Sequence, residues 1–321
     1  MIPFKQQPLA ELPSAPDRKH RFYDADPRTL TIDGGFGEHS VHVRVFGAGP
    51  PLLLVHGLMT HSYSWRYLFG VLGERYTCYA PDLVGCGRSD APDGDHRPAA
   101  LCRWLSEVID ALGIRGCPTI GNSMGGYLCM HLAMQDPTAM GCLVNLHAPG
   151  IPTARMWALH FVMRIPGAQA LLRQLVWRDA EQWAHHNVHY YDESLKSIEE
   201  AREYALPLKT RAGIRAFARY LGQTMSPFEM NALNRLLQAG FPIPLQLVYA
   251  TEDPMVPPWI GERLAARIPA ASLVRLDRAS HFAHVDATER FAEAVVPFLA
   301  TVRGAGSADS GSPGRPGSTG D

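Results

Sequence analysis

The chain has 321 residues, of which 46% are hydrophobic and 19% charged, and its formal net charge is -1 at pH 7. This length and composition predict one large α/β domain with an insertion and a sizeable core. The near-zero net charge gives no reason to expect nucleic acid or an anionic membrane surface as a partner. The first residues lack the apolar stretch of a secretory signal, and no run approaches the roughly 18 apolar residues of a membrane span. We therefore expect a cytoplasmic protein that does not cross a membrane.

All six cysteines fall in the first half of the chain, mostly within apolar runs. They are Cys78, Cys86, Cys102, Cys117, Cys129 and Cys142. No two form a C-x-x-C pair, so a zinc cluster is not expected. We expect small buried side chains in a reducing compartment.

The first third of the chain alternates between strand and helix patterns. Residues 1–27 are rich in proline and charge, and we expect them to form an irregular surface arm. Residues 29–32 and 41–45 alternate between apolar and polar side chains, which predicts a hairpin around Gly34 and Gly35. Residues 52–55 are a continuous apolar run, as in a strand buried on both faces.

Helical spacing over residues 64–72 and 99–112 continues this alternation, which predicts a core over residues 28–150 and 239–303. Between residues 151 and 238 no clear strand pattern appears, and the helical stretches there are rich in aromatic side chains and methionine. Residues 304–321 are a low-complexity run that we expect to be a disordered tail.

The hexapeptide Gly-Asn-Ser-Met-Gly-Gly at residues 121–126 is the strongest functional signal. It separates an apolar strand-like run from a helix-like pattern, which predicts a sharp turn with Ser123 at its apex in a strained backbone conformation. The small residues Gly121 and Gly125 let the strand and the helix meet. We expect Ser123 to be a nucleophile and the backbone N–H of Met124 to stabilise a developing negative charge. The alternative is a serine that caps a helix, which would not need flanking glycines.

A serine hydroxyl needs a base and an orienting acid, and two later strand patterns offer both. Asp253 follows the apolar run 245–250, and His281 follows the run 272–276. We expect His281 to accept the proton of Ser123 and Asp253 to fix the tautomer of the imidazole. The order nucleophile, acid, base is that of a hydrolase elbow.

Each partner has a rival nearby. Glu252 precedes Asp253 but faces elsewhere in an extended segment. Asn145, which follows an earlier strand pattern, carries no charge and so favours Asp253. His284 lies close to His281, and we expect it to pack or to line the substrate pocket.

Five motifs in the same order resemble the alpha/beta-hydrolase family. They are residues 52–57, 79–90, 121–126, 250–257 and 281–286. The resemblance implies a mostly parallel central sheet with helices on both faces, and a helical cap over residues 151–238, inserted after strand six. It also implies that the backbone N–H of Leu58 is the second oxyanion donor. His56 and Asp82 are expected to be structural hydrogen-bonding residues in this pattern.

The substrate pocket is expected to be apolar, because aromatic side chains are frequent in the helical segment. We expect Trp65, Trp157, Phe161 and His284 to line it, although Trp65 alone could simply pack a helix. His185 and His189 could place two imidazoles one helical turn apart, as in a metal site. No third ligand stands at a convincing spacing, so we expect a polar cap face and no metal.

The sequence therefore predicts a cofactor-free serine hydrolase that cleaves a small to medium, partly apolar carboxylic ester through an acyl-enzyme. Haloalkane dehalogenases and epoxide hydrolases resemble residues 56–65, but their chemistry needs a carboxylate nucleophile. Hydrolysis of a carbon–carbon bond (as in meta-cleavage-product hydrolases), a lactone or a thioester stays an alternative, as does acyl transfer. A non-catalytic small-ligand receptor on the same fold is an alternative of another class. The oligomeric state is not predicted.

Overall fold

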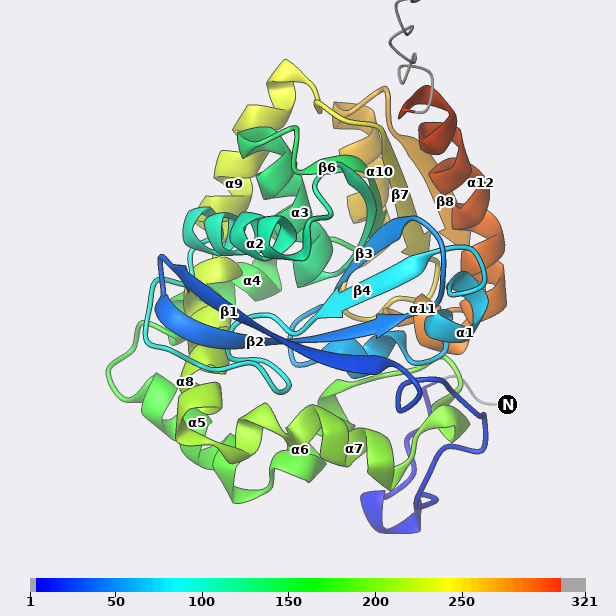
Figure 1. The fold of residues 1–321 in the computed structure, drawn as a ribbon. Coiled ribbons are helices and arrows are strands. Elements are labelled where there is room, and N and C mark those ends of the chain that lie inside the picture. The colour runs from blue at the N-terminus through cyan, green and yellow to red at the C-terminus, as the bar shows by residue number, and fades with distance from the viewer. Residues whose placement is uncertain (1–3, 307–321) are drawn as a thin grey trace, which may run out of the picture.

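An eight-stranded sheet runs through the centre of the molecule (Figure 1). The structure is a computed structural model, and it describes residues 4–306. The strand order is β1-β2-β4-β3-β5-β6-β7-β8, with β1 and β2 antiparallel to their neighbours and the other six strands parallel to one another. The strands are β1 (Asp26–Gly34), β2 (Gly37–Phe46), β3 (Pro51–Val55), β4 (Thr77–Pro81), β5 (Cys117–Asn122), β6 (Met140–Leu146), β7 (Leu245–Ala250) and β8 (Ser272–Leu276). The predicted fold class is confirmed.

The predicted leading hairpin is formed by β1 and β2, which pair from Asp26 opposite Val45 to Gly34 opposite Gly37. Gly37 has a φ of 73°, a conformation that glycine adopts without steric cost. The strand begins at Asp26, so the arm expected over residues 1–27 ends two residues earlier than its predicted boundary.

Helices cover both faces of the sheet (Figure 1). On one face lie α2 (Pro98–Leu112), α3 (Met124–Gln135) and α10 (Trp259–Arg267). On the other lie α1 (Leu68–Leu72) and α12 (Thr288–Gly306), with the short η2 (Ser62–Trp65) and α11 (Ala283–Asp286) next to it. Successive leucines of β3 enter the two opposite cores, because side chains alternate along a strand: Leu53 belongs to the α2–α3 cluster and Leu54 to the α1–α12 cluster. This strand is therefore buried on both faces, as its continuous apolar run predicts.

The helical insertion, residues 151–238, lies between β6 and β7, and the described structure has no strand in it. Its helices α5, α6 and α7 lie beyond one edge of the sheet (Figure 1). Its elements, the last of which ends at Ala239, are α4 (Ala154–Val162), α5 (Ala168–Arg178), α6 (Ala180–Asn187), η3 (Glu193–Leu195), α7 (Ile198–Ala205), η4 (Pro207–Lys209), α8 (Arg211–Arg219), the π-turn η5 (Tyr220–Thr224), α9 (Pro227–Leu236) and η6 (Leu237–Ala239). The side chains of Thr153, Asp179, Ser197 and Thr210 accept backbone N–H groups in the first turns of α4, α6, α7 and α8, which sets where these helices begin.

The N-terminal arm ties this insertion to the core. It contains one short turn, η1 (Leu9–Glu11), and is otherwise irregular over its described residues up to β1. The carbonyl of Pro13 accepts the N–H of Ile198 in α7 (2.9 Å), and the N–H of Arg21 donates to the carbonyl of Arg66 (3.1 Å). The arm therefore contacts α7 of the insertion and the backbone between η2 and α1 of the core.

Helix α12 corrects one boundary. It continues to Gly306, so the tail predicted over residues 304–321 is wrong for its first three residues, because the i→i-4 ladder of the helix extends through them. The remainder of that tail lies outside the described residues. The six cysteines are buried and free, which confirms the prediction of small buried side chains.

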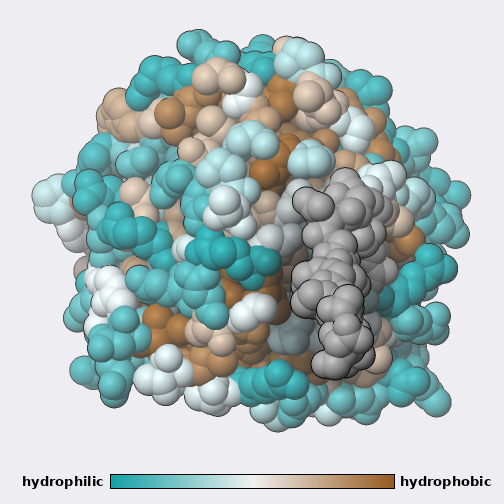
Figure 2. All heavy atoms as spheres, turned by 45° about the horizontal axis from the view of Figure 1, so that its top comes forward, coloured by the Kyte–Doolittle hydropathy of each residue, from teal (hydrophilic) through white to brown (hydrophobic). Residues whose placement is uncertain are grey.

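No helix in the described part of the chain has the length and apolar character needed to cross a bilayer. On the face seen when the top of Figure 1 is tilted forward, hydrophilic side chains surround several separate groups of apolar ones (Figure 2).

Candidate active site

Ser123 is the single residue between the end of β5 and the start of α3. Its φ is 51° and its ψ is -120°, a region that non-glycine residues rarely occupy. Its side chain makes no capping hydrogen bond to α3, which excludes the alternative of a simple helix cap. The residue is 8% exposed, so it is largely but not fully sealed. The predicted strained turn is thus present, with the serine at its apex.

The glycines around this turn are required by close backbone contacts. A Cβ on Gly121 would lie 2.6 Å from the Cα of Gly126, and one on Gly125 would lie 2.3 Å from the carbonyl oxygen of Val55. Either distance is far below van der Waals contact. The strand, the helix and neighbouring β3 can meet at the serine only because these positions have no side chain.

Asp253 and His281 are hydrogen-bonded beyond the ends of β7 and β8. The Asp253 Oδ2 lies 2.7 Å from the His281 Nδ1, while Oδ1 accepts the N–H groups of Met255 (2.7 Å) and Val256 (2.9 Å). Burial opposes ionisation of this carboxyl, but the charge and hydrogen bond of His281 outweigh it and lower the pKa of Asp253 below its ordinary value. Asp253 is therefore an ionised acceptor for the imidazole N–H.

The rival acids point elsewhere. Glu252 accepts the backbone N–H of Arg278 (2.9 Å), and the Asn145 side chain accepts the N–H of Ala148 (3.2 Å). Neither has a hydrogen bond to His281 among the contacts of the described residues.

The backbone of His281 is tied to the serine turn. Its carbonyl oxygen accepts hydrogen bonds from the Asn122 side chain (3.3 Å) and from the Nδ1 of His147 (3.0 Å). The two imidazole rings stack with centroids 5.4 Å apart, and the His147 Nε2 accepts the N–H of Ala250 (2.8 Å). Burial lowers the pKa of His147 to about 4, so it is neutral. Sequence reasoning missed His147; its place just past the end of β6, at the same sheet edge, was the available signal.

The turn after β3 lies against the serine. A Cβ on Gly57 would lie 3.2 Å from the Cβ of Ser123, which places the backbone leading to Leu58 beside the hydroxyl. His56 holds this turn, because its Nδ1 donates to the carbonyl of Gly57 (2.8 Å) and its Nε2 accepts the N–H of Leu83 (2.9 Å). Burial lowers the pKa of His56 to about 4, which matches the neutral form that this pair of hydrogen bonds requires.

Asp82 holds the neighbouring loop. Its two carboxylate oxygens accept the backbone N–H groups of Ser62 (2.8 Å) and Arg88 (2.9 Å). The structural roles expected for His56 and Asp82 are confirmed by these hydrogen bonds.

Residues 50–288 match the family described as the alpha/beta hydrolase fold. The chain belongs to this family. It is 28% identical over 284 residues to haloalkane dehalogenase 2 of Mycobacterium tuberculosis, covering 85% of this chain and 97% of that protein. It is 27% identical over 289 residues to a 2-hydroxy-6-oxononadienedioate/2-hydroxy-6-oxononatrienedioate hydrolase of Cupriavidus pinatubonensis, covering 85% and 94%.

Among solved structures, the hydrolase fold is matched by the epoxide hydrolase CorEH without ligand. The TM-score is 0.73 at 20% sequence identity, and the match covers 87% of this chain and 100% of that one. At this identity the likeness establishes the fold. These proteins are named for different activities: a haloalkane dehalogenase, a hydrolase of a dienedioate and an epoxide hydrolase.

The four side chains expected to line the pocket form two pairs of contacting rings, Trp65 with His284 and Trp157 with Phe161. Trp65 is fully buried and its ring centroid lies 4.6 Å from that of His284. Trp157 and Phe161 stack 6.0 Å apart on the insertion, and Phe161 is 60% exposed. Burial lowers the pKa of His284 well below its ordinary value, so this imidazole is neutral.

The histidines of residues 185–189, expected on a polar cap face, differ in burial: His186 is exposed, but His185 is not. His185 is buried, and its Nε2 lies 2.8 Å from the carbonyl oxygen of Gln7 in the arm. A different set, His147, Asp253 and His281, brings its ligand atoms within 4.8 Å of one another, but both nitrogens of His147 and the Nδ1 of His281 already have hydrogen-bond partners.

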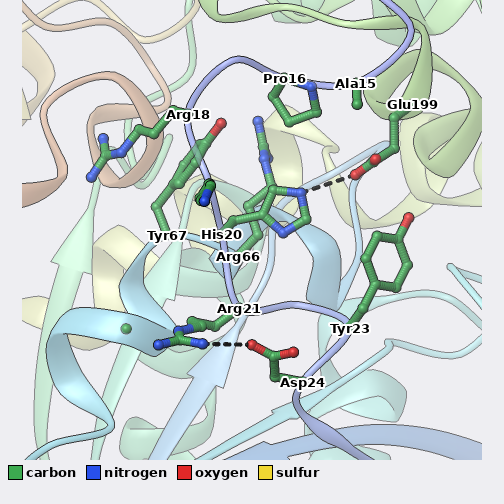
Figure 3. A pocket seen from close by; sticks show the side chains of 12 residues that line it. Ala15, Pro16, Arg18, His20, Arg21, Tyr23, Asp24, Arg66, Tyr67 and Glu199 are labelled. Carbon is green, nitrogen blue, oxygen red and sulfur yellow. Dashed lines mark hydrogen bonds and ion pairs between the residues drawn. The ribbon is translucent and has the colours of Figure 1, made fainter.

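A hollow of about 690 Å³ lies away from these residues, between the arm, α7 and the start of α1 (Figure 3). Its charged groups are largely paired: the His20 Nε2 lies 2.9 Å from Glu199, and Arg21 lies 3.0 Å from Asp24. Neither Ser123 nor its expected partners Asp253 and His281 line it.

Proposed function

We propose that this protein is a cofactor-free serine hydrolase that cleaves carboxylic esters through an acyl-enzyme. The observation that carries the proposal is the 2.7 Å hydrogen bond between Asp253 and His281, at the sheet edge where Ser123 stands on its strained turn. A nucleophile, a base and an ionised orienting group are the minimum set for acyl transfer.

In the first half of the reaction the Ser123 Oγ attacks the ester carbonyl carbon while His281 accepts its proton at Nε2. Asp253 accepts the Nδ1–H, which fixes the tautomer and stabilises the imidazolium that forms. The N–H groups of Met124 and Leu58 donate to the oxyanion, and such donors contribute about 3 kcal/mol each. The tetrahedral intermediate collapses, His281 returns its proton to the leaving oxygen, and an alcohol departs.

In the second half, water replaces the alcohol. His281 takes a proton from the water as its oxygen attacks the acyl-enzyme, a second oxyanion forms in the same place, and the acid leaves as Ser123 regains its proton. No electron transfer or metal is needed for either half.

The serine distinguishes this reaction from those named for several relatives. Opening a carbon–halogen bond or an epoxide through an alkyl-enzyme ester needs a carboxylate nucleophile, and position 123 carries a hydroxyl. Hydrolysis of a carbon–carbon bond in a vinylogous diketone acid stays the second candidate, since the 2-hydroxy-6-oxononadienedioate hydrolase is 27% identical to this chain over 94% of its own length. Lactones and thioesters share the acyl chemistry.

The test compares Ser123→Ala with Ser194→Ala on a panel of nitrophenyl esters and a vinylogous diketone acid. Ser194 is an exposed serine whose hydroxyl is bonded to Asp192, so its variant is a matched control. We expect the first variant to lose roughly 10⁶-fold in kcat and the second to retain activity. Near-normal turnover by Ser123→Ala would end the proposal, and turnover of the diketone acid alone would favour carbon–carbon cleavage.

Labelling by a fluorophosphonate separates an enzyme from a receptor. A reactive serine forms a covalent adduct that the Ser123→Ala variant lacks, whereas a non-catalytic receptor is not labelled at this position. We also propose a cytoplasmic location, because six buried free thiols suit a reducing compartment.

A further inference from the structure

Large apolar side chains are exposed mainly on the helical insertion. Of the ten most exposed ones in the described structure, eight belong to the insertion. They are Phe161, Val162, Ile165, Leu171, Leu175, Trp177, Phe228 and Leu236, each between 46% and 60% exposed. Six of them fall between residues 161 and 177, on the end of α4, the turn after it and α5. Single exposed apolar residues are ordinary, but such a concentration marks an interaction surface.

The same stretch is uniformly basic. Residues 151–178 contain Arg155, Arg164, Arg173 and Arg178, with no aspartate or glutamate. The described structure gives none of the four an ion pair, although elsewhere arginines such as Arg115 bind two acidic side chains. Although the overall charge is -1, this part of the surface is positively charged, and a positively charged surface attracts anions.

A hollow of about 470 Å³ between α5 and α8 adds a cationic feature to this surface. Arg173, Arg211 and Arg215 line it together with Trp177. Only Arg215 has an acidic neighbour within 4 Å among the described residues, Asp93 at 3.6 Å. Guanidinium groups bind phosphate through paired N–H donors, and a half-exposed indole is favoured at the boundary between apolar and aqueous phases.

We propose that the α4–α5 surface, defined as residues 155–178, docks on an anionic phospholipid bilayer. Its apolar side chains enter the headgroup region while its arginines bind lipid phosphates, as basic amphipathic helices do. The purpose of docking rests on the proposed function: a hydrolase of apolar esters held at a bilayer is close to the lipid phase in which such esters concentrate.

Charge decides between a bilayer and a second copy of the chain. A symmetric dimer through this surface would bring the four unpaired arginines of each copy against those of the other. Like charges that face each other across an interface are unfavourable, whereas the anionic headgroups of a bilayer would neutralise the arginines of the chain that docks on it.

The test measures co-sedimentation of the full chain with vesicles of phosphatidylcholine, alone or with about 30% phosphatidylserine, because anionic lipid is the attracting component. The variants are Leu171→Ser/Leu175→Ser, which lie one turn apart on α5, and Arg164→Glu/Arg173→Glu. Arg103→Glu on α2 is the control, because Arg103 is exposed, lies outside the insertion and has no ion pair in the described structure.

We expect binding to the anionic vesicles only, weakened about tenfold or more by each double variant and little by the control. Hydrolysis of a soluble nitrophenyl ester should stay unchanged in all of them, so a failure of docking is distinct from a failure of the proposed catalysis. Equal binding to both vesicles, no binding, or a concentration-dependent dimer abolished by the leucine variant would overturn the inference. Retention of inorganic phosphate by the arginine hollow without vesicle binding would do so as well.

Discussion

The Oδ2 of Asp253 lies 2.7 Å from the Nδ1 of His281, although 28 positions separate them in the chain. The relationship follows from the sheet: β7 and β8 are adjacent parallel strands, so the loops after their carboxyl ends are neighbours. Replacement of Asp253 by asparagine should lower kcat by about 10⁴-fold, because an amide can stabilise the wrong tautomer and carries no charge for the imidazolium. Steady-state kinetics with the best ester of the panel measures this.

Glu252 provides the matched control for that variant. It is the adjacent carboxylate, but it accepts a hydrogen bond from the N–H of Arg278 and none from His281 among the contacts of the described residues. Glu252→Gln should therefore change kcat by no more than about threefold. A change of that size corresponds to less than about 1 kcal/mol in the activation free energy. Equal losses in the two variants would mean that the acid has been assigned to the wrong residue.

The packing of the serine turn predicts a large effect from one methyl group. Gly125→Ala would place a Cβ 2.3 Å from the carbonyl oxygen of Val55, and backbone cannot move aside as a side-chain tip can. We expect a loss of about 3 kcal/mol or more in the free energy of unfolding, measured by urea titration. Gly35→Ala is the control, because no atom lies within 4 Å of its added Cβ. If both variants unfold at the same urea concentration, the close approach is not real.

The sequence predicts the elbow well because its determinants are local. A strand, a serine between small residues and a helix lie within twenty positions, and each element has its own pattern. Parallel strands then bring the ends of distant runs to one edge, so their order predicts that the loops carrying Asp253 and His281 are neighbours, and the 2.7 Å hydrogen bond between these two side chains agrees with it. The hairpin and the strand at residues 52–55 follow from alternation and burial in the same way.

Contacts that depend on tertiary packing could not be predicted. The stacking of His147 on His281 needs the relative height of β6 and β8, which no local pattern contains. Likewise, an aromatic residue in a helix looks the same in the sequence whether it is buried or exposed. Phe161 was therefore expected at a pocket, and in the structure it is 60% exposed.

His131 in α3 predicts a pH dependence of stability. It is buried, its Nε2 has no hydrogen-bond partner among the described residues, and burial lowers its pKa from 6.5 to about 4. Between these values the unfolded chain binds the extra proton and the folded chain does not. The stability that this group contributes is therefore complete above pH 6.5 and is lost as the pH falls toward 4.

His131→Gln removes this titration while keeping a polar side chain of similar length. From pH 7 down to about pH 5 the wild type should lose about 2 kcal/mol more than the variant in its free energy of unfolding. Urea titrations of both proteins across that interval give the difference directly, and the other buried histidines cancel because both proteins contain them. Parallel stability curves would show that His131 is not shielded from water.

A buried ion pair joins the core to the insertion. The Arg66 Nη2, just past η2, lies 2.5 Å from the Glu200 Oε2 on α7, and the Tyr190 hydroxyl donates to the same oxygen (2.5 Å). Both charged side chains are almost completely buried. Arg66→Met should therefore destabilise the protein by about 3–5 kcal/mol, because it leaves the Glu200 carboxylate without its cation.

The double variant Arg66→Met/Glu200→Gln separates the loss of the pair from the loss of packing. If the cost of Arg66→Met comes from a stranded charge, neutralising Glu200 as well should restore part of the stability, and the two single effects should not add. Thermal and urea unfolding of the four proteins in the cycle give the coupling energy. If the effects of the two single variants on the free energy of unfolding add exactly, the two charges do not interact, and other contacts hold α7 against the core.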